Sequence, residues 1–455
     1  MSHQDVLDLT SLEAYRRSCL ELARRRLSGF SSIKEIAAAE HELNAYPGLD
    51  WLEEPREVRL FDEEDLSAEL LAKAKQTVLN GGLFTEHTAA GEATRLKLGT
   101  KFLLHPAQDL TVDGVAALMS GQLRRPVSVE EVREALETDP ADLLPLSLGW
   151  RHMLQLAYDI HDLAVQVGRD PQEVLGRQKL LIVLNEKTAE QILKEFVQAR
   201  LFGFPRRGVF FMVQPLFYGI DLRDGRFFYQ TASRKRLHNH GQLVMQETMD
   251  DQIFTLGASG ERVYLKAAQY RDILDAAADK LSYNIEDLGY LTGAIDWPSL
   301  AQALQLGNEG YAMVMEIVAN NPKRPQKGAL PAFDPDLGRD VMIESFQLMG
   351  RPNRELKYLN KNFNHFPSPL TSWEALKAKK LPMLLAVKEG YLYFQPVQGD
   401  INFLVKTAFV RRREVRPISA WKSASNTPAA INAMARQDRQ PGFQRFVEGV
   451  LGRKL

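Results

Sequence analysis

The stretch that decides the fold reads K-L-L-I-V-L at residues 179–184. This short apolar run is typical of a strand that is buried on both faces. Residues 188–200 follow it with one apolar helical face, formed by Ile192, Leu193, Phe196 and Val197. The next strand reads G-V-F-F-M-V at 208–213. Because strand, helix and strand in this order form a right-handed parallel crossover, the sequence predicts an α/β fold with a mixed, mostly parallel sheet covered by helices on both faces.

The same patterns predict how the rest of the chain is organised. Further strands are expected at 286–294, 311–319, 340–348, 382–394 and 402–410, and a helix at 265–280. Residues 320–335 hold four prolines and are expected to be a loop. We therefore predict a helical N-terminal region at 1–76, a large α/β domain at 77–370 and a small α/β C-terminal region at 371–455.

Composition limits the partners that the protein can have. The 455 residues include 57 Lys and Arg against 58 Asp and Glu, so a formal charge of -1 gives no general attraction to nucleic acid or to an anionic membrane. The single cysteine, Cys19, cannot form an internal disulfide, and nothing reaches about 18 consecutive apolar residues. We expect a cytoplasmic protein that binds neither nucleic acid nor membrane. The oligomeric state stays open.

A candidate phosphate-binding loop reads A-A-G-E-A-T-R-L-K-L-G-T-K at residues 89–101. Gly91 has no Cβ, so the main chain around Ala90 and Glu92 could approach an anion closely. Arg95 and Lys101 would add full positive charges. The alternative is an ordinary turn, because the loop matches neither G-x-G-x-x-G nor G-x-x-x-x-G-K-[ST].

Ten short segments occur in an order that is similar to one family. They are A-G-E-A-T-R-L with T-K at 90–101, L-N-E-K-T at 184–188, L-F-G-F at 201–204, M-V-Q-P at 212–215, N-H-G at 239–241, A-I-D at 294–296, K-G-A at 327–329, I-E-S-F-Q at 343–347, L-N-K-N-F at 359–363 and F-L-V-K-T at 403–407. Together they resemble the UDP-glucose / UDP-N-acetylglucosamine pyrophosphorylase family, which joins UTP and a sugar 1-phosphate.

The resemblance implies a Rossmann-like nucleotidyltransferase sheet and a uridylyltransferase that acts on UTP and a sugar 1-phosphate. It implies Arg95, Lys101 and Lys406 as catalytic residues, and Mg²⁺ as the metal, held by Asp296. The residues that it implies for nucleotide and sugar binding are Ala90, Gly91, Glu92, Gln214, His240, Gly241, Glu344 and Asn360.

Some of these roles also follow from the residues themselves. Asp296 ends an apolar run, 288–295, that we expect to be a strand, and ligands of open α/β sheets bind at the carboxyl ends of strands. Mg²⁺ usually takes one or two carboxylates there. Alternatively, Asp296 would be a helix N-cap before Pro298. Lys406 has apolar neighbours on both sides, although a lone lysine in a strand is more often a solvated edge charge.

Two further side chains suit a nucleotide. Gln214 has both the donor and the acceptor needed to read a uracil edge. His240 lies in a basic segment in which Gly241 permits close backbone approach. Both could equally be plain loop residues.

Three functions remain open. The first is the uridylyltransferase, with glucose 1-phosphate and N-acetylglucosamine 1-phosphate both possible substrates. The second is a nucleotide-sugar-binding protein without turnover, which four departures from the family pattern favour: Ala90, Thr100, Asn239 and Ala294. The third is a glycosyltransferase, for which the D-x-D at 334–336 lies in the proline-rich loop rather than at a strand end.

Overall fold

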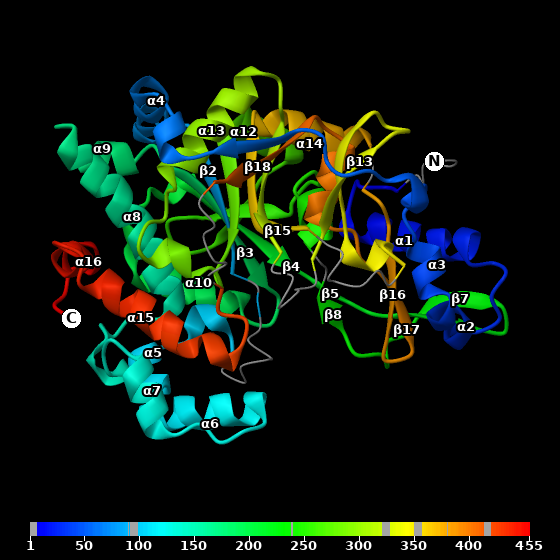
Figure 1. Ribbon diagram of the computed structural model, residues 1–455, viewed down its shortest axis with the longest axis horizontal. Helices are drawn as coiled ribbons and strands as arrows, with labels where there is room; N and C mark the ends of the chain where they lie inside the picture. The colour runs from blue at the N-terminus through cyan, green and yellow to red at the C-terminus, as the bar shows by residue number, and fades with distance from the viewer. Residues whose placement is uncertain are drawn as a thin grey trace.

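A ten-stranded sheet forms the centre of the computed structural model (Figure 1). The structure describes residues 7–89, 91, 99–237, 240–320, 328–349, 357–379, 381–413 and 420–455, with the backbone alone at 237, 240 and 361–363. In spatial order the strands are β1 (Val58–Phe61), β18 (Thr407–Arg412), β12 (Met313–Ala319), β15 (Tyr358–Pro367), β11 (Asp279–Asn284), β2 (Leu83–Thr88), β3 (Lys179–Asn185), β4 (Val209–Gln214), β9 (Ile253–Leu256) and β10 (Arg262–Tyr264).

Most of these strands run in one direction. Only β15 and β9 are antiparallel to the neighbours on both of their sides. The carboxyl ends of β2, β3, β4, β11, β12 and β18 therefore lie along one edge of the sheet, which we call the carboxyl edge. The prediction of a mixed, mostly parallel sheet is confirmed.

Helices cover both faces of the sheet, as predicted. On one face, Leu180, Ile182 and Leu184 of β3 join a core with α4 (Ala68–Leu79), α8 (Leu148–Gln166), α9 (Pro171–Leu175), α10 (Ala189–Gln198) and α13 (Trp297–Asn308). On the other face, Leu181 and Val183 pack with residues of α11 (His240–Gln246), α12 (Ala267–Asp275) and α14 (Pro369–Ala378). The alternation of β3 side chains between two cores explains its unbroken apolar sequence.

A second group of elements packs beside the sheet, on the right in Figure 1. Its four-stranded sheet has the order β16 (Leu385–Lys388), β17 (Tyr391–Phe394), β6 (Ile220–Arg223) and β7 (Arg226–Tyr229). The helices α1 (Leu12–Arg26), α2 (Ile33–Ala38) and α3 (Glu40–Asn44) complete its core. Two small two-stranded sheets pair β13 (Leu330–Asp334) with β14 (Arg339–Ile343), and β5 (Leu216–Phe217) with β8 (Arg236–Leu237).

The remaining helices lie at the left and bottom of Figure 1. They are α5 (Pro106–Asp109), α6 (Val112–Leu123), α7 (Val129–Ala135), α15 (Thr427–Asp438) and α16 (Phe443–Leu451). Four short 3₁₀ helices matter for the site: η3 (Lys101–Leu103), η7 (Leu288–Leu291), η8 (Ser345–Gln347) and η10 (Gln398–Phe403).

The structure corrects three expectations. The central sheet is not confined to the domain expected at 77–370. Its strands β1 and β18 lie outside these bounds in sequence, and they pair with each other in the sheet. The proline-rich segment contains a strand, β13, whose Pro331 is tolerated because the hairpin has only two strands. The strand expected at 286–294 is wrong: β11 ends at Asn284, and η7 occupies that stretch.

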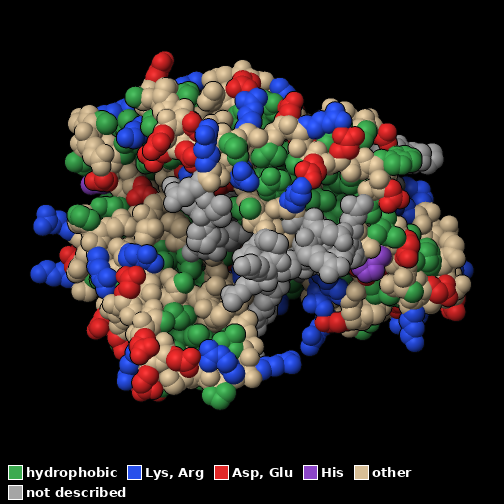
Figure 2. Space-filling model, in the orientation of Figure 1, with side chains coloured by type: hydrophobic (Ala, Val, Ile, Leu, Met, Phe, Trp, Pro, Cys, Tyr) green, Lys and Arg blue, Asp and Glu red, His purple; other side chains and the backbone are tan. Residues whose placement is uncertain are grey.

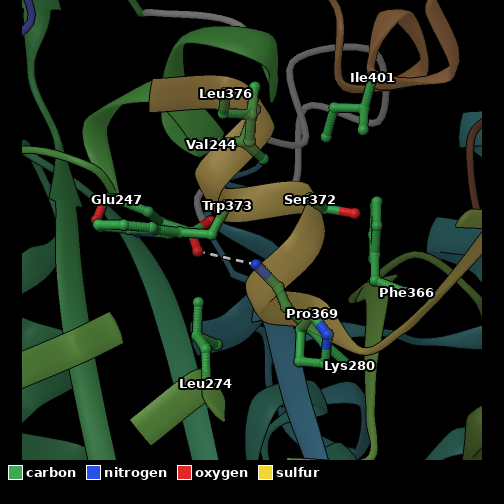
Figure 3. Close-up of a pocket in the computed structure, with 10 residues that line it drawn as sticks. All are labelled: Val244, Glu247, Leu274, Lys280, Phe366, Pro369, Ser372, Trp373, Leu376 and Ile401. Atoms are coloured by element: carbon green, nitrogen blue, oxygen red, sulfur yellow. Dashed lines mark hydrogen bonds and ion pairs between the residues drawn. The ribbon is translucent and has the colours of Figure 1, made fainter. Parts of the chain in front are cut away.

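The strand β11 could not be predicted from an apolar pattern, because it contains charged side chains, which are paired inside the fold. Lys280 Nζ lies 2.5 Å from Glu86 Oε2 and 2.8 Å from Glu247 Oε2. Asp279 Oδ2 lies 2.6 Å from His365 Nδ1. Figure 3 shows Lys280 and Glu247 lining a small cavity with apolar side chains of α12 and α14. Buried charges of this kind are tolerated only when they are paired.

The visible surface carries mixed charge. Figure 2 shows acidic and basic side chains interspersed over this face, in keeping with the near-zero net charge. Within the part of the chain that the structure describes, no helix is both long and apolar enough to cross a membrane.

Candidate active site

Four polar side chains line one face of the sheet at its carboxyl edge. Thr88 lies opposite Asn284, and Asn185 lies opposite Gln214, at the ends of β2, β11, β3 and β4. The register places all four on the same face, since Thr88 also lies opposite Val183, two residues before Asn185. We call these four residues the polar ledge. Gln214, predicted from sequence to read a uracil edge, is one of them.

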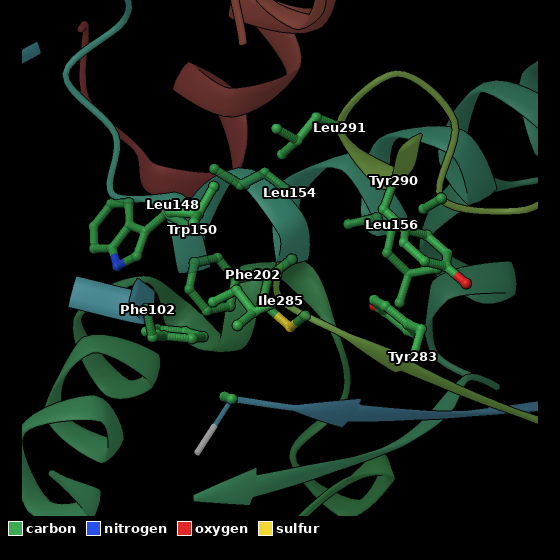
Figure 4. Packing of buried hydrophobic residues seen from close by; sticks show 14 of the residues in the cluster. Phe102, Leu148, Trp150, Leu154, Leu156, Phe202, Tyr283, Ile285, Tyr290 and Leu291 are labelled. Carbon is green, nitrogen blue, oxygen red and sulfur yellow. The ribbon is translucent and has the colours of Figure 1, made fainter. Parts of the chain in front are cut away.

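Lys101 is held beside this ledge by close packing. The next residue, Phe102, is fully buried against α8 (Figure 4). A Cβ on Gly149 would come within 2.3 Å of the Phe102 ring, so only glycine allows this contact. Lys101 Nζ donates to Glu286 Oε2 at 2.7 Å and to the Trp421 carbonyl at 2.9 Å. The ammonium is therefore fixed at the carboxyl edge, with a carboxylate as its counter-ion.

Glu286 follows two residues after the end of β11. Its second oxygen, Oε1, lies 3.2 Å from Lys422 Nζ. Burial works against its ionisation, but the charges of Lys101 and Lys422 hold the pKa of Glu286 below its ordinary value. Its N–H bonds to Asn284 of the ledge at 3.3 Å. Glu286 is thus an ionised carboxylate between two ammonium groups.

The C-terminal segment supplies Lys422 to this cluster. Trp421 donates its N–H to the Glu286 carbonyl at 2.7 Å, and its fully buried indole donates to Thr427 Oγ1 at 3.1 Å. Helix α15 is in turn fixed by Arg151 of α8, whose guanidinium donates to both Asp438 oxygens at 2.6 and 3.1 Å. Lys422 is therefore placed by a segment that is anchored at both ends.

The prediction that Asp296 ends a strand is wrong, and its role as a metal ligand stays a prediction. Asp296 is the N-cap of α13, accepting the Ser299 N–H at 3.1 Å, and it forms an ion pair with Arg412. No strand precedes it, since η7 occupies that stretch. The alternative N-cap interpretation is confirmed.

Lys406 lies away from the carboxyl edge, contrary to prediction. It precedes the first residue of β18, so it lies at the edge opposite the carboxyl edge. Its Nζ donates to the Glu309 carbonyl at 3.1 Å and lies over the Tyr311 ring. Helix α13 runs between Asp296 and this end, a distance of about 18 Å for twelve residues. Asp296 and Lys406 therefore do not share a pocket.

The other predicted residues have mixed outcomes. Arg95, Ala90 and Glu92 lie outside the described residues, as does the side chain of His240. No described atom lies within 4 Å of a Cβ built on Gly91, whose neighbours at 90 and 92–98 lie outside the described residues. A Cβ on Gly241 would lie 2.3 Å from the Pro396 carbonyl carbon, so packing alone requires this glycine. Glu344 is partly buried beside η10, and Asn360 lies in β15 opposite Ile317.

Sequence reasoning missed Glu286 and Lys422. Glu286 belongs to the sequence N-I-E at 284–286, in which an acid follows two residues after an Asn. This pattern lies at a strand end once β11 is known to end at Asn284. Lys422 belongs to the sequence W-K-S at 421–423. This sequence has the same order of apolar, lysine and hydroxyl residues as V-K-T at 405–407.

Solved structures with the same fold are UDP-sugar pyrophosphorylases. The UDP-N-acetylglucosamine pyrophosphorylase of Trypanosoma brucei aligns with a TM-score of 0.59 and 15% identity, over 92% of this chain and 79% of its own. A variant of the UDP-glucose pyrophosphorylase of Leishmania major aligns with a TM-score of 0.53 and 12% identity, over 91% of this chain and 78% of its own. No family model and no curated protein sequence matches this chain. The fold implied by the resemblance is confirmed.

Proposed function

We propose that this protein is a cytoplasmic uridylyltransferase that joins UTP and a sugar 1-phosphate to give UDP-glucose or UDP-N-acetylglucosamine and pyrophosphate. The observation that supports it most is the meeting of Lys101, Glu286 and Lys422 beside the polar ledge. This cluster stands at the carboxyl edge of a fold shared with UDP-sugar pyrophosphorylases.

The reaction needs positioning and charge neutralisation. An oxygen of the sugar phosphate attacks the α-phosphorus of UTP in line, the bond to the β-phosphate oxygen breaks, and pyrophosphate leaves with that electron pair. No covalent protein intermediate is required. Lys101 and Lys422 would contact the phosphate oxygens on which negative charge collects. Gln214 would accept from and donate to the uracil edge.

The residues at this edge fit a magnesium ion. Glu286 offers an ionised carboxylate, and Mg²⁺ prefers oxygen ligands, taking one or two carboxylates together with substrate phosphates. We propose Glu286 in the role that the sequence assigned to Asp296. When bound, the ion would neutralise charge on the triphosphate. Lys101 and Lys422 would then be released from the carboxylate to the phosphate oxygens.

One observation favours a nucleotide-sugar-binding protein without turnover as a second candidate. Both Glu286 oxygens are already engaged by lysines, and two of the three donors of Lys101 are engaged by Glu286 and by the Trp421 carbonyl. The D-x-D at 334–336 does not support the glycosyltransferase alternative. Its Asp334 caps the β13–β14 turn by accepting the N–H groups of Asp336 and Leu337.

Pyrophosphate release separates the two candidates. The purified protein is incubated with Mg²⁺, UTP and a panel of sugar 1-phosphates, and pyrophosphate and UDP-sugar are both quantified. Steady release in equal amounts, lost in Lys101→Ala, supports the uridylyltransferase. Saturable UDP-sugar binding by calorimetry with no release from any sugar supports the binding protein.

A further inference from the structure

The end of β4 is paired on one side of the sheet only. Gln214, its last residue, lies opposite Asn185 of β3, whereas the described pairing with β9 on the other side extends only to Met212. The next residue, Pro215, has no N–H to donate to a neighbouring strand. The placement of Gln214 therefore depends on the groups that hold the chain directly after it.

Three hydrogen bonds hold the chain on both sides of Pro215. The Glu186 N–H donates to the Gln214 carbonyl at 3.1 Å, and Glu186 Oε2 accepts the Leu216 N–H at 2.7 Å. The Leu216 carbonyl accepts from the guanidinium of Arg16 at 2.9 Å. Both backbone groups of Leu216 are thus held by side chains, one from the turn after β3 and one from α1, 200 positions earlier in the chain.

The guanidinium of Arg16 is itself held in place. It lies over the Phe217 ring, with Cζ 5.7 Å from the ring centroid. The Arg16 carbonyl accepts the Tyr229 hydroxyl, and the Tyr229 ring packs edge-on against Phe217 with the centroids 5.4 Å apart. A cation over an aromatic face is attracted to it, which restricts the rotamers of a long side chain. These contacts fix where Arg16 meets Leu216.

Two other arginines of α1 make the same kind of bond elsewhere. Arg24 donates to the Phe227 carbonyl at 3.3 Å, and Arg26 donates to the Met383 carbonyl at 2.7 Å. Both acceptors belong to the group of elements beside the central sheet, so these bonds attach the helix to its own group. Arg16 differs from them because its acceptor lies in the segment that leaves β4 at the carboxyl edge.

We propose that Arg16 and Glu186 are positioning residues that hold Gln214 for recognition of the base, so that the N-terminal helix α1 forms part of the nucleotide site. The inference rests on the proposed function and adds to it two residues for which the sequence predicts no role. Gln214 is the group that touches the base. Arg16 and Glu186 act only through the main chain that carries it.

Selectivity between bases is the property that this support controls. A glutamine amide carries both a donor and an acceptor, so an amide that is free to turn can pair with uracil or with cytosine, whose donors and acceptors are interchanged. An amide held in one position favours one of the two bases. The informative quantity is therefore the ratio of the CDP to the UDP dissociation constant, because the two ligands share the same diphosphate.

Equilibrium binding measures this ratio without requiring turnover. Dissociation constants for UDP and CDP are determined by calorimetry for the wild type, Arg16→Ala, Glu186→Ala and Glu186→Gln. Arg26→Ala is the matched control, because it removes a bond from α1 to a backbone carbonyl away from β4. Gln214→Ala gives the ratio that remains without the amide.

We expect the wild type to prefer UDP and the ratio to fall toward the Gln214→Ala value, about tenfold in Arg16→Ala, as a hydrogen bond from a charged group is lost. The fall should be about fivefold in Glu186→Ala, because Glu186 is exposed and water can replace part of its bond. The ratio should stay within about twofold of wild type in Arg26→Ala, and in Glu186→Gln, whose amide oxygen still accepts the Leu216 N–H.

An unchanged ratio in Arg16→Ala, or an equal fall in Arg26→Ala, would overturn the role of Arg16, and an unchanged ratio in Glu186→Ala would overturn that of Glu186. If Arg16→Ala does not fold, Arg16→Met decides the matter, since it keeps the packing on Phe217 and removes the donors. Equal affinity of the wild type for UDP and CDP would overturn this inference alone, whereas absence of UDP binding would overturn the proposed function.

Discussion

Lys101 and Glu286, separated by 185 positions in the chain, form a 2.7 Å ion pair at the carboxyl edge of the sheet. On the proposed function, each is the counter-ion that the other exchanges for substrate. When a metal-bound triphosphate binds, its phosphate oxygens would pair with Lys101 and Lys422, and its metal ion would pair with the Glu286 carboxylate. No charge would then be left unpaired in a partly buried site.

Lys422→Ala should reduce pyrophosphate release by about a hundredfold, because the lost charge faces the reacting phosphates. The matched control is Lys406→Ala, which removes a lysine at the opposite edge and should stay within about twofold of wild type. Initial rates at saturating UTP and sugar 1-phosphate measure both. Equal losses in the two variants would contradict the placement of the site.

Glu286→Gln should raise the Mg²⁺ concentration that gives half-maximal turnover about tenfold or more, since an amide replaces the ionised ligand. Asp287→Asn is the control, because it keeps the side-chain acceptor for the Gly289 N–H and removes a neighbouring charge. Magnesium titrations of pyrophosphate release, with a chelator as the zero point, give the answer. An unaltered titration for Glu286→Gln would remove it from the metal site.

Asp296→Ala should act on stability. It removes a helix cap and a partner of the buried Arg412, so we expect a loss of about 2–3 kcal/mol in urea unfolding. Asp170→Ala removes a cap of the same kind, at α9, and should cost only about 1 kcal/mol. The Mg²⁺ dependence of the folded Asp296→Ala fraction should match wild type, and a shift there would restore the metal role.

Glu247 should make stability fall as pH rises. Burial and the charge of Glu86 together raise the pKa of Glu247 to about 8, against the opposing charge of Lys280. The folded state thus keeps a proton that the unfolded state loses near pH 4.5, so the stabilisation is full below that pH and is lost on rising to about 8. Urea unfolding between pH 5 and 9 should show a steeper decline for wild type than for Glu247→Gln. Parallel curves would contradict the assignment.

Gly241→Ala should destabilise the protein by about 1–3 kcal/mol, because the new Cβ would meet the backbone of Pro396 and Val397 at 2.3 to 2.5 Å. Gly29→Ala meets no described atom within 4 Å and should change stability by less than about 0.5 kcal/mol. Thermal and urea unfolding of both variants compares them. An equally stable Gly241→Ala would leave nucleotide contact as the reason for that glycine.

Apolar patterns predicted the fold well where strands bury hydrocarbon on both faces. The runs at 179–184 and 208–213 became β3 and β4, and the amphipathic segment between them became α10. The pattern failed at β11, whose D-K-L-S-Y-N sequence is stabilised by ion pairs with residues distant in the chain, such as Glu86 and His365. Patterns within a single segment cannot predict ion-pair partners that are distant in the chain.

That single failure displaced much of the predicted site. With the strand placed about ten residues late, Asp296 stood at its expected end and Glu286 did not. Similarly, V-K-T at 405–407 matched a motif, but β18 begins at Thr407, so Lys406 is at the wrong end of its strand. Gln214 does end its strand, as expected, because the apolar run of β4 continues directly to it.

The bond between Lys101 and the Trp421 carbonyl spans 320 positions, which has a consequence for synthesis of the chain. The loop lysine leaves the ribosome long before its main-chain acceptor has been made, and Lys422 comes later still. A nascent or truncated chain that ends before residue 420 would contain the ledge residues but would lack the Trp421 carbonyl and Lys422. On the proposed function, such a chain would not bind a triphosphate, and substrate binding would begin only when the C-terminal segment docks.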